Sequence, residues 1–380
     1  MMSYSYSDHF NHALFKEANH WNDKLAPITS CELKKISFPE PEWWTGAIQL
    51  AKNPVGSFFT STPIASAGTS IFAHEAAIRA LGEALERYSS VNSHQIDEAY
   101  MQPVDEQLGF VRCADFEPTL PSFKANGITQ PIEHSKVNRL LDGSEAYLPY
   151  EYVHLEFIRS NKQLMHTMPL STGCAFYYDW LVAVGKGICE VVERDAMMRL
   201  WYTRAQPLRI CTKNSLDYAL HTRIKRIKEA NLTVHLFEIS SAVDIPVVYA
   251  ILQGECYPYY CVGAAADFNP TKAISKAIDE AVSIRAVVNW KKSKGLKKHD
   301  YSNFAWVNQL DDHMELYAGW KNTPAFDFLL KSDLKHITVD QLQRTKARSS
   351  PNTMTDLVQL AQKFKQCGFD IYYKDITLPE

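Results

Sequence analysis

The sequence lacks the short motifs that mark several common protein classes. Its eight cysteines include no Cys-x-x-Cys pair, and no histidine pair with zinc spacing lies near a cysteine pair. A zinc-binding module is therefore not expected. Neither Gly-x4-Gly-Lys-Ser/Thr nor Gly-x-Gly-x-x-Gly occurs, so phosphates would not be bound by either of those glycine-rich loops. Scattered cysteines favour a reducing compartment, and we expect a cytoplasmic protein.

Charge and hydrophobicity exclude further classes. The formal net charge is only −3, with acidic and basic residues interspersed, so the sequence predicts no nucleic-acid partner. No run approaches the roughly 18 apolar residues that span a bilayer. The N-terminus has neither the charged nor the apolar segment of a signal peptide, and we expect no membrane association. With 380 residues and 46% hydrophobic content, the chain can bury one large core or two medium ones.

Three segments of the chain repeat one layout. Each begins with a glycine among small residues, passes through an alanine, and has a glutamate seven residues after that alanine. A small residue also stands three positions before each glutamate. The segments are Gly68–Arg87 with Ala76, Ala80 and Glu83; Gly173–Arg194 with Ala183, Gly187 and Glu190; and Gly263–Arg285 with Ala273, Ala277 and Glu280.

The first two segments close with Glu-x-x-Glu-Arg, as Glu83-Ala-Leu-Glu86-Arg87 and Glu190-Val-Val-Glu193-Arg194. Residues three, four and seven apart share one face of a helix, so the acids, the arginine and the small residues align. Mg²⁺ is held by a few carboxylates together with substrate phosphates, and arginine binds phosphate oxygens bidentately. The pattern therefore favours a site for a nucleotide triphosphate with Mg²⁺.

One such motif alone would more simply be a solvated helix surface with an ion pair worth about 0.3–0.5 kcal/mol. A duplication retained for packing would explain the repeated alanines. It would not explain why acids and arginine recur on the packed face. We therefore favour the interpretation as a nucleotide and Mg²⁺ site.

Local signals predict the structure around these segments. Ser70 and Asp179 are predicted to cap the first two helices, and Asn269-Pro270 to begin the third. Short strands are predicted over 232–239, 246–252 and 259–265, a last helix around 357–364, and a strand from Phe369. The elements indicate an α+β fold of layered mixed sheets with packed helices. We expect residues 1–60 to form an N-terminal extension on one catalytic domain, 61–380.

The runs AGTSIFAHEAAIRALGEALERYSS, STGCAFYYDWLVAVGKGICEVVERDAMMRLW and VGAAADFNPTKAISKAIDEAVSIR resemble the three nucleotide-binding blocks of the YcaO superfamily. The resemblance runs from about Ser61 to the C-terminus. It is strongest to the stand-alone YcaO subunits of thiazole/oxazole-modified peptide cyclodehydratases of the streptolysin and microcin type. We refer to the three segments below as blocks 1, 2 and 3.

The resemblance implies an ATP-dependent enzyme that activates backbone amides of a ribosomal precursor peptide and forms azoline rings at Cys, Ser or Thr during bacteriocin maturation. ATP and Mg²⁺ are the implied cofactors. The implied metal ligands are Glu83, Glu86, Glu190 and Glu280, and the nucleotide-binding set adds Arg87, Glu193, Arg194 and Arg285. No catalytic base is implied.

The implied partners are the precursor peptide, a leader-binding E1-like (ThiF-type) protein and, in some systems, an FMN-dependent dehydrogenase; a homodimer stays open. Arg79 stands where many relatives have serine, and Ala67–Ser70 lacks the lysine of many first glycine loops. The sequence stops at Thr377–Glu380, where azoline-forming relatives continue into a Pro-rich tail, so the domain is expected to be truncated or divergent. A nucleotide-binding accessory or scaffold protein of the same fold, or a thioamide- or amidine-forming relative, is the alternative.

Overall fold

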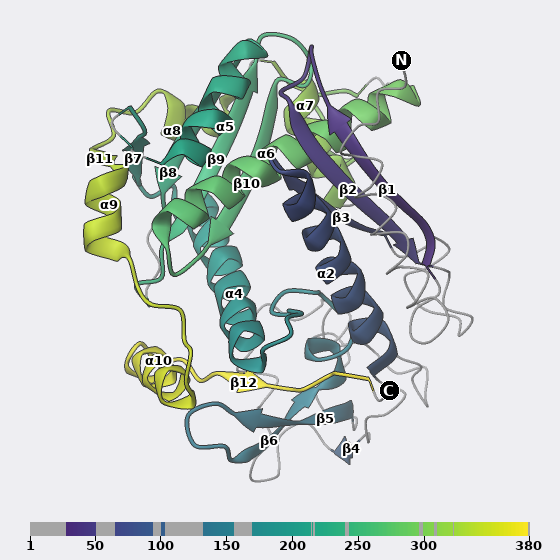
Figure 1. The fold of residues 1–380 in the computed structure, drawn as a ribbon, viewed down its shortest axis with the longest axis vertical. Helices are drawn as coiled ribbons and strands as arrows, with labels where there is room; N and C mark the ends of the chain where they lie inside the picture. The colour runs from purple at the N-terminus through teal and green to yellow at the C-terminus, as the bar shows by residue number, and fades with distance from the viewer. Residues whose placement is uncertain are drawn as a thin grey trace, which may run out of the picture.

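The fold consists of three sheets with helices packed against them (Figure 1). A computed structural model describes residues 28–50, 65–93, 100–102, 132–155, 169–213, 215, 217–239, 243–295, 299–307, 310–321 and 323–378. None of the helices in these ranges is both long and apolar enough to cross a membrane.

The first sheet is antiparallel, with strand order β1-β2-β3, and α2 covers one of its faces. Glycines let the helix approach closely, because a Cβ atom on Gly46 would lie 2.9 Å from the carbonyl oxygen of Ala76. The buried helix face is therefore built from alanines such as Ala76 and Ala80. The elements are β1 (Ile28–Ile36), β2 (Trp43–Leu50), β3 (Ala65–Ser70) and α2 (Ala73–Asn92).

The second sheet has five strands in the order β10-β9-β8-β7-β11, antiparallel except for the parallel pair β7–β11. The interior strand β9 is buried on both faces, which is why it is almost entirely apolar. The strands are β7 (Leu208–Cys211), β8 (Leu232–Glu238), β9 (Val247–Gly254), β10 (Tyr260–Ala266) and β11 (His336–Thr338).

Helices cover both faces of this five-stranded sheet. Alternate residues of β9 enter two separate cores: Val248, Ala250 and Leu252 pack with one helix layer, and Tyr249 and Ile251 with the other. The first layer contains α5 (Tyr218–Glu229), α6 (Pro270–Ser293) and α9 (Val339–Lys346), and the second contains α4 (Trp180–Thr203) and α10 (Met354–Gln366).

A third sheet, of four strands, has the order β12-β5-β4, with β6 paired to β5. The side chain of Trp180, at the start of α4, makes an edge-to-face contact with Tyr373 of β12. The remaining elements are β4 (Tyr100–Gln102), β5 (Ile132–Arg139), β6 (Glu145–Pro149), η3 (Tyr150–Tyr152), α7 (Leu310–Gly319), η4 (Pro324–Phe326), α8 (Asp327–Leu330) and β12 (Tyr372–Tyr373).

The predicted fold class and most predicted elements are confirmed. Asp179 caps α4 by accepting hydrogen bonds from two backbone N–H groups, and Asn269 caps α6 in the same way, with Pro270 in its first turn. The prediction that Ser70 caps the first helix is wrong. The chain is still extended at Ser70, which ends β3, and α2 begins only at Ala73, after Phe72.

The predicted boundary at residue 60 falls between two strands of one sheet. Residues 28–50 supply β1 and β2, and β2 pairs directly with β3 of the predicted catalytic domain. This part of the predicted extension is integral to the sheet that carries block 1. The boundary itself stays a prediction, since residues 51–64 lie outside the described ranges.

Candidate nucleotide and magnesium site

The three repeated glutamates share one contact. Each accepts a hydrogen bond from a backbone N–H near the start of its own block, 16 or 17 residues earlier. The distances are 2.9 Å from Ala67 to Glu83 Oε2, 3.2 Å from Gly173 to Glu190 Oε2, and 2.7 Å from Ala264 to Glu280 Oε2. The sequence repeat therefore corresponds to a repeat of side-chain placement.

Two of the three anchoring groups, those of blocks 1 and 3, lie at the edges of two sheets. β3 ends one sheet and β10 ends the other, so each has N–H groups that pair with no further strand among the described residues. On β10, Ala264 donates to Glu280 of block 3 and Ala266 donates to Glu193 of block 2, at 2.7 and 3.2 Å. One edge strand thus holds acids from α4 and α6, and the glutamates take the place of a further strand.

Small residues in the repeat permit this arrangement. A Cβ atom on Gly68 would lie 2.2 Å from the carbonyl oxygen of Ala76, and one on Gly263 would lie 2.4 Å from that of Ala277. Such distances are far inside contact, so helix and strand can meet only where the strand residue is glycine. In block 2 the close approach involves Gly187 instead, whose Cβ would lie 2.6 Å from the carbonyl oxygen of Gly173.

Electrostatics show that the acids of the three blocks converge. Burial, together with the charges of Glu190 and Glu83, raises the pKa of Glu86 to about 8. Burial and the charge of Glu280 raise the pKa of Glu193 to about 8. The pKa values of Glu190 and Glu280 are also raised, chiefly by burial, and both carboxylates are repelled by Glu83. We call Glu83, Glu86, Glu190, Glu193 and Glu280 the acid cluster.

The arginines of blocks 1 and 2 face this acid cluster. Arg87 is paired with Glu83 at 3.3 Å, and Arg194 lies 3.6 Å from Glu193 and 3.9 Å from Glu190. The Nε atom of Arg87 is buried and has no hydrogen-bond partner among the described residues. A buried unpaired donor is unfavourable by about 1–3 kcal/mol, which is consistent with a ligand completing this site.

Arg285, by contrast, is not brought to the acid cluster. Its guanidinium is buried and pairs with Glu40 at 2.5 and 3.0 Å, while Nη1 donates to the carbonyl oxygen of Pro258 at 2.6 Å. These contacts occupy the side chain. The structure thus gives Arg285 a packing role between α6 and the loops before β2 and β10, and nothing in it supports the nucleotide contact that the resemblance implied.

Three basic residues lie beside the acid cluster and were not assigned to the site from the sequence. Arg79, Lys186 and Lys276 each stand four residues, about one helical turn, before the glutamate of their block. Lys186 is close enough to the others that burial and then Lys276 lower its pKa, with a smaller effect from Arg79, while Asp267 and Glu86 oppose the change. The repeated offset was visible in the sequence and could have identified the three bases.

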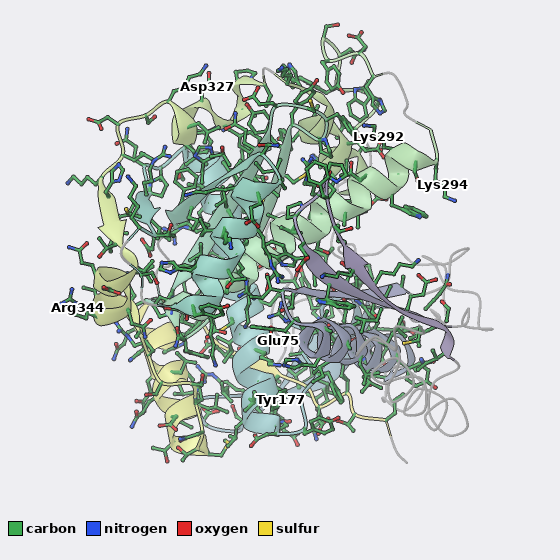
Figure 2. All side chains as sticks on the ribbon, turned by 45° about the horizontal axis from the view of Figure 1, so that its top comes forward. Glu75, Tyr177, Lys292, Lys294, Asp327 and Arg344 are labelled. Atoms are coloured by element: carbon green, nitrogen blue, oxygen red, sulfur yellow. The ribbon has the colours of Figure 1, made fainter. Side chains whose placement is uncertain are left out.

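The bases differ in how they are held. Lys276 pairs with Asp267 at 2.6 Å, whereas the Nζ atom of Lys186 lies 4.2 Å from the centre of the Tyr177 ring. Tyr177 is labelled beside α4 in Figure 2 and is 46% exposed, so the ring and the ammonium both remain reachable from solvent. Of these three bases, Lys186 thus contacts an aromatic ring, whereas Arg79 and Lys276 pair with carboxylates.

The donor set fits Mg²⁺ bound together with phosphates. Among the described residues, no three His, Cys, Asp or Glu side chains come close enough to enclose a metal ion by themselves. Mg²⁺ characteristically uses one or two carboxylates and completes its coordination with water and substrate phosphates. Clustered carboxylates with raised pKa values beside arginine and lysine side chains match that mode of binding.

Two cysteines and a run of lysines lie outside this chemistry. Burial raises the pKa of the Cys174 thiol to about 11 and that of Cys189 to about 12, so neither is an activated nucleophile. Lys291 pairs with Asp311 at 2.7 Å and Glu315 at 3.1 Å, and Lys292 and Lys294 lie at the outer end of α6 (Figure 2). The basic run extends over residues 291–298, of which 296–298 lie outside the described residues.

The chain matches the protein family described as YcaO cyclodehydratase, ATP- and Mg²⁺-binding, over residues 67–380. No curated protein sequence matches it. A solved heterocyclase in complex with substrate and cofactor has a TM-score of 0.70 at 18% identity, covering 96% of this chain and 50% of the heterocyclase. The chain therefore spans half the length of that relative.

Two further solved structures share the fold. YcaO from Methanopyrus kandleri bound with AMPPCP and Mg²⁺ has a TM-score of 0.65 at 16% identity, covering 97% of this chain and 86% of that one. The E. coli microcin synthetase McbBCD complex has a TM-score of 0.54 at 14% identity, covering 88% and 81%. These identities establish the fold alone. The family match over most of the sequence goes further: the chain belongs to the YcaO family of ATP- and Mg²⁺-binding cyclodehydratases.

Proposed function

We propose that this protein uses ATP to activate backbone amides of a ribosomal precursor peptide and converts Cys, Ser or Thr residues into azoline rings. The observation that carries the proposal is the convergence of five glutamates from three helices into one partly buried cluster. Such a cluster is self-repelling until cations enter it. The family description and the nucleotide and Mg²⁺ bound to the M. kandleri relative support Mg²⁺ and ATP as its ligands.

The residues divide into two groups by charge. We assign Mg²⁺ binding to Glu83, Glu86, Glu190 and Glu280, with Glu193 beside them. Arg87 and Arg194 are assigned to the phosphates, because the guanidinium group matches phosphate oxygens bidentately. Lys186 joins them as a third cation on the basis of its place one turn before Glu190.

When bound, Mg²⁺ supplies charge neutralisation to the phosphoryl group that ATP transfers. In the proposed reaction the thiol or hydroxyl of the precursor attacks the preceding carbonyl carbon, and the resulting oxygen receives the terminal phosphoryl group of ATP. Loss of inorganic phosphate then leaves the ring, so ATP becomes ADP and phosphate while the peptide loses one water. The arginines and Lys186 hold the transferring group in place.

The solved heterocyclase contains substrate, and the microcin synthetase is a multi-protein complex. By analogy, we propose a precursor peptide as substrate and a separate leader-binding protein as partner. An FMN-dependent dehydrogenase that oxidises the azoline and a homodimeric state of this chain stay predictions from the resemblance, as does a cytoplasmic location.

Mass spectrometry tests the proposed reaction. The protein is incubated with a precursor peptide and a leader-binding partner protein, with ATP and Mg²⁺, and the peptide is expected to lose the mass of one water per ring. Glu190→Gln should abolish the loss, whereas Glu229→Gln, which changes an exposed glutamate of α5, should not. ATP hydrolysis without any loss of water would support the accessory-protein alternative and contradict ring formation.

A further inference from the structure

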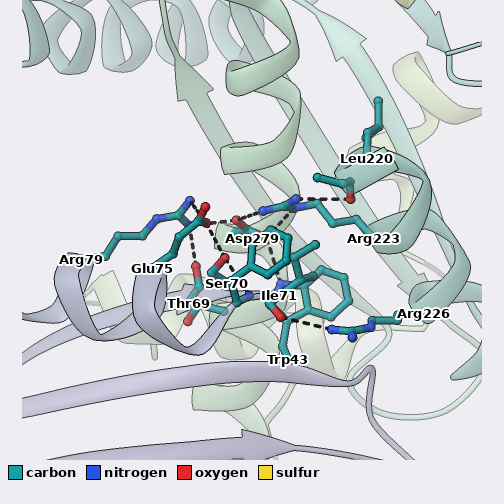
Figure 3. Close-up of polar contacts among 12 residues, drawn as sticks. Trp43, Thr69, Ser70, Ile71, Glu75, Arg79, Leu220, Arg223, Arg226 and Asp279 are labelled. Carbon is teal, nitrogen blue, oxygen red and sulfur yellow. Dashed lines mark hydrogen bonds and ion pairs between the residues drawn. The ribbon is translucent and has the colours of Figure 1, made fainter. Parts of the chain in front are cut away.

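A buried carboxylate lies directly beside the acid cluster. Asp279 precedes Glu280 on α6 and is only 2% exposed. Its oxygens accept hydrogen bonds from Trp43 Nε1 at 2.9 Å, from Arg223 at 2.9 and 2.8 Å, and from Arg79 Nη1 at 2.8 Å (Figure 3). We call these four residues the Asp279 junction. It joins β2, α2, α5 and α6.

Arg79 is the member of the junction that reaches from block 1. It lies one turn before Glu83 on α2, and its Nη1 also donates to the carbonyl oxygen of Thr69 on β3 at 2.5 Å. Its Nη2 pairs with Glu75 at 3.2 Å. One guanidinium therefore fixes the start of α2 to its own edge strand and to the residue before Glu280.

The charges of the junction do not require Arg79 for balance. Arg223 already forms a two-pronged pair with Asp279, and both side chains are only 3% exposed. Buried ion pairs are weak evidence for stability, since desolvation offsets most of the attraction, but their hydrogen-bond geometry fixes the relative positions of the elements they join. Without Arg79, Asp279 would remain paired, and what would be lost is the bridge between α2 and α6.

We propose that Arg79 is a positioning residue that sets the placement of Glu83 on α2 relative to Glu280 on α6. The inference rests on the proposed function, because it concerns the same Mg²⁺ and ATP site. A phosphate-bridged metal site depends on the spacing between helices that carry its ligands, and a misplacement of about 1 Å can reduce activity by about a hundredfold. Arg79 holds that spacing through Asp279 without touching the ligand.

The test compares Arg79→Met with Arg226→Met by calorimetric titration of ATP at a series of Mg²⁺ concentrations. Arg226 is a matched control in the same region (Figure 3), since it pairs with Glu42 at 3.0 Å and donates to the Glu42 carbonyl oxygen at 2.9 Å. Arg79→Met is expected to raise the Mg²⁺ concentration for half-maximal ATP binding by about tenfold or more. Arg226→Met should leave it unchanged, with a similar loss of thermal stability in both variants.

Arg79→Lys provides a second measurement if the methionine variant does not fold. Lysine keeps the charge but cannot donate in one plane to Asp279, Glu75 and Thr69 together, so a Mg²⁺ requirement between those of wild type and Arg79→Met is expected. An unchanged requirement in the Arg79 variants, or an equal rise in Arg226→Met, would overturn the positioning role. Failure of the wild-type protein itself to bind ATP would instead overturn the proposed function.

Discussion

Block 2 holds its glutamate differently from blocks 1 and 3. In blocks 1 and 3 an edge strand runs against the helix, and a strand residue, Ala67 or Ala264, donates to the glutamate. In block 2 the donor is Gly173, which lies in a loop and has a positive φ of 91°. The same hydrogen bond to a glutamate is thus donated by a strand residue in blocks 1 and 3 and by a loop residue in block 2.

This difference indicates which features of the repeat are essential. What all three blocks share is a glutamate bonded to a backbone N–H 16 or 17 residues earlier, and a small residue three positions before the glutamate. Regular strand structure is not shared. Blocks 1 and 3, in which a strand packs against the helix, should therefore tolerate an added methyl group poorly. Block 2, in which a loop packs against the helix, should accommodate it by a shift of the loop.

The largest effect is expected from Gly263→Ala in block 3. The added Cβ would lie 2.4 Å from the carbonyl oxygen of Ala277 and 2.5 Å from the backbone nitrogen of Ala281, and neither group can move without displacing α6. We expect a loss of about 3 kcal/mol in the free energy of unfolding, measured with urea. Gly185→Ala is the control, because its nearest new neighbour would be at an ordinary 3.5 Å. Equal stabilities of the two variants would contradict the tight strand–helix packing.

A second effect is expected from pH, through Glu86 of block 1 and Glu193 of block 2. The pKa of Glu86 and that of Glu193 are raised from 4.5 to about 8 in the folded protein. Between these values the folded state binds more protons than the unfolded state, so the ligand-free protein should lose stability as pH rises from about 4.5 to about 8. Thermal melts across this range measure the slope, which Glu86→Gln should reduce. A stability that rises with pH over the same range would contradict the acid cluster.

Gly187→Ala in block 2 is expected to change stability by about 1 kcal/mol or less, because the gain in helix propensity offsets a clash with a movable loop. The new Cβ would lie 2.6 Å from the carbonyl oxygen of Gly173, so the loop should shift and weaken the N–H contact to Glu190. ATP affinity should fall more than stability does. A loss as large as that of Gly263→Ala would remove the distinction between the blocks.

The smallest effect is expected from Gly82→Ala on α2. Among the described residues, no atom outside the adjacent turns of its own helix lies within 4 Å of the position where its Cβ would be, so the substitution meets no clash there. Replacing a helix glycine by alanine should then raise the free energy of unfolding by about 0.5–1 kcal/mol. Urea denaturation provides the measurement, and a destabilised variant would mean that α2 is packed more tightly at this point than the structure indicates.

The acid cluster could be predicted from the sequence because the residues of each block lie close together along the chain. Glycine, alanine and glutamate recur at fixed offsets, and helical geometry turns those offsets into one face. The caps at Asp179 and Asn269 were predictable for the same reason. The bases Arg79, Lys186 and Lys276 obey an equally local rule, and they were missed because only the acids and the arginines after them were aligned.

Contacts between distant segments could not be predicted in this way. Arg285 closes block 3 near the position that Arg87 and Arg194 occupy in blocks 1 and 2. Its partner Glu40 is 245 residues away in the sequence. Nothing in the local pattern reveals a carboxylate from a strand connection. The Asp279 junction joins residues up to 236 positions apart and was invisible for the same reason.

The central claim is that acids from three helices bind ATP through Mg²⁺, and calorimetric titration of ATP into Glu83→Gln, Glu190→Gln and Glu280→Gln tests it most directly. Glutamine can still accept the anchoring N–H but carries no charge for a metal. We predict that each variant keeps or exceeds wild-type thermal stability and loses Mg²⁺-dependent ATP binding, as the wild type does when Mg²⁺ is chelated. Wild-type ATP affinity in all three variants, or tight binding without Mg²⁺, would contradict the account.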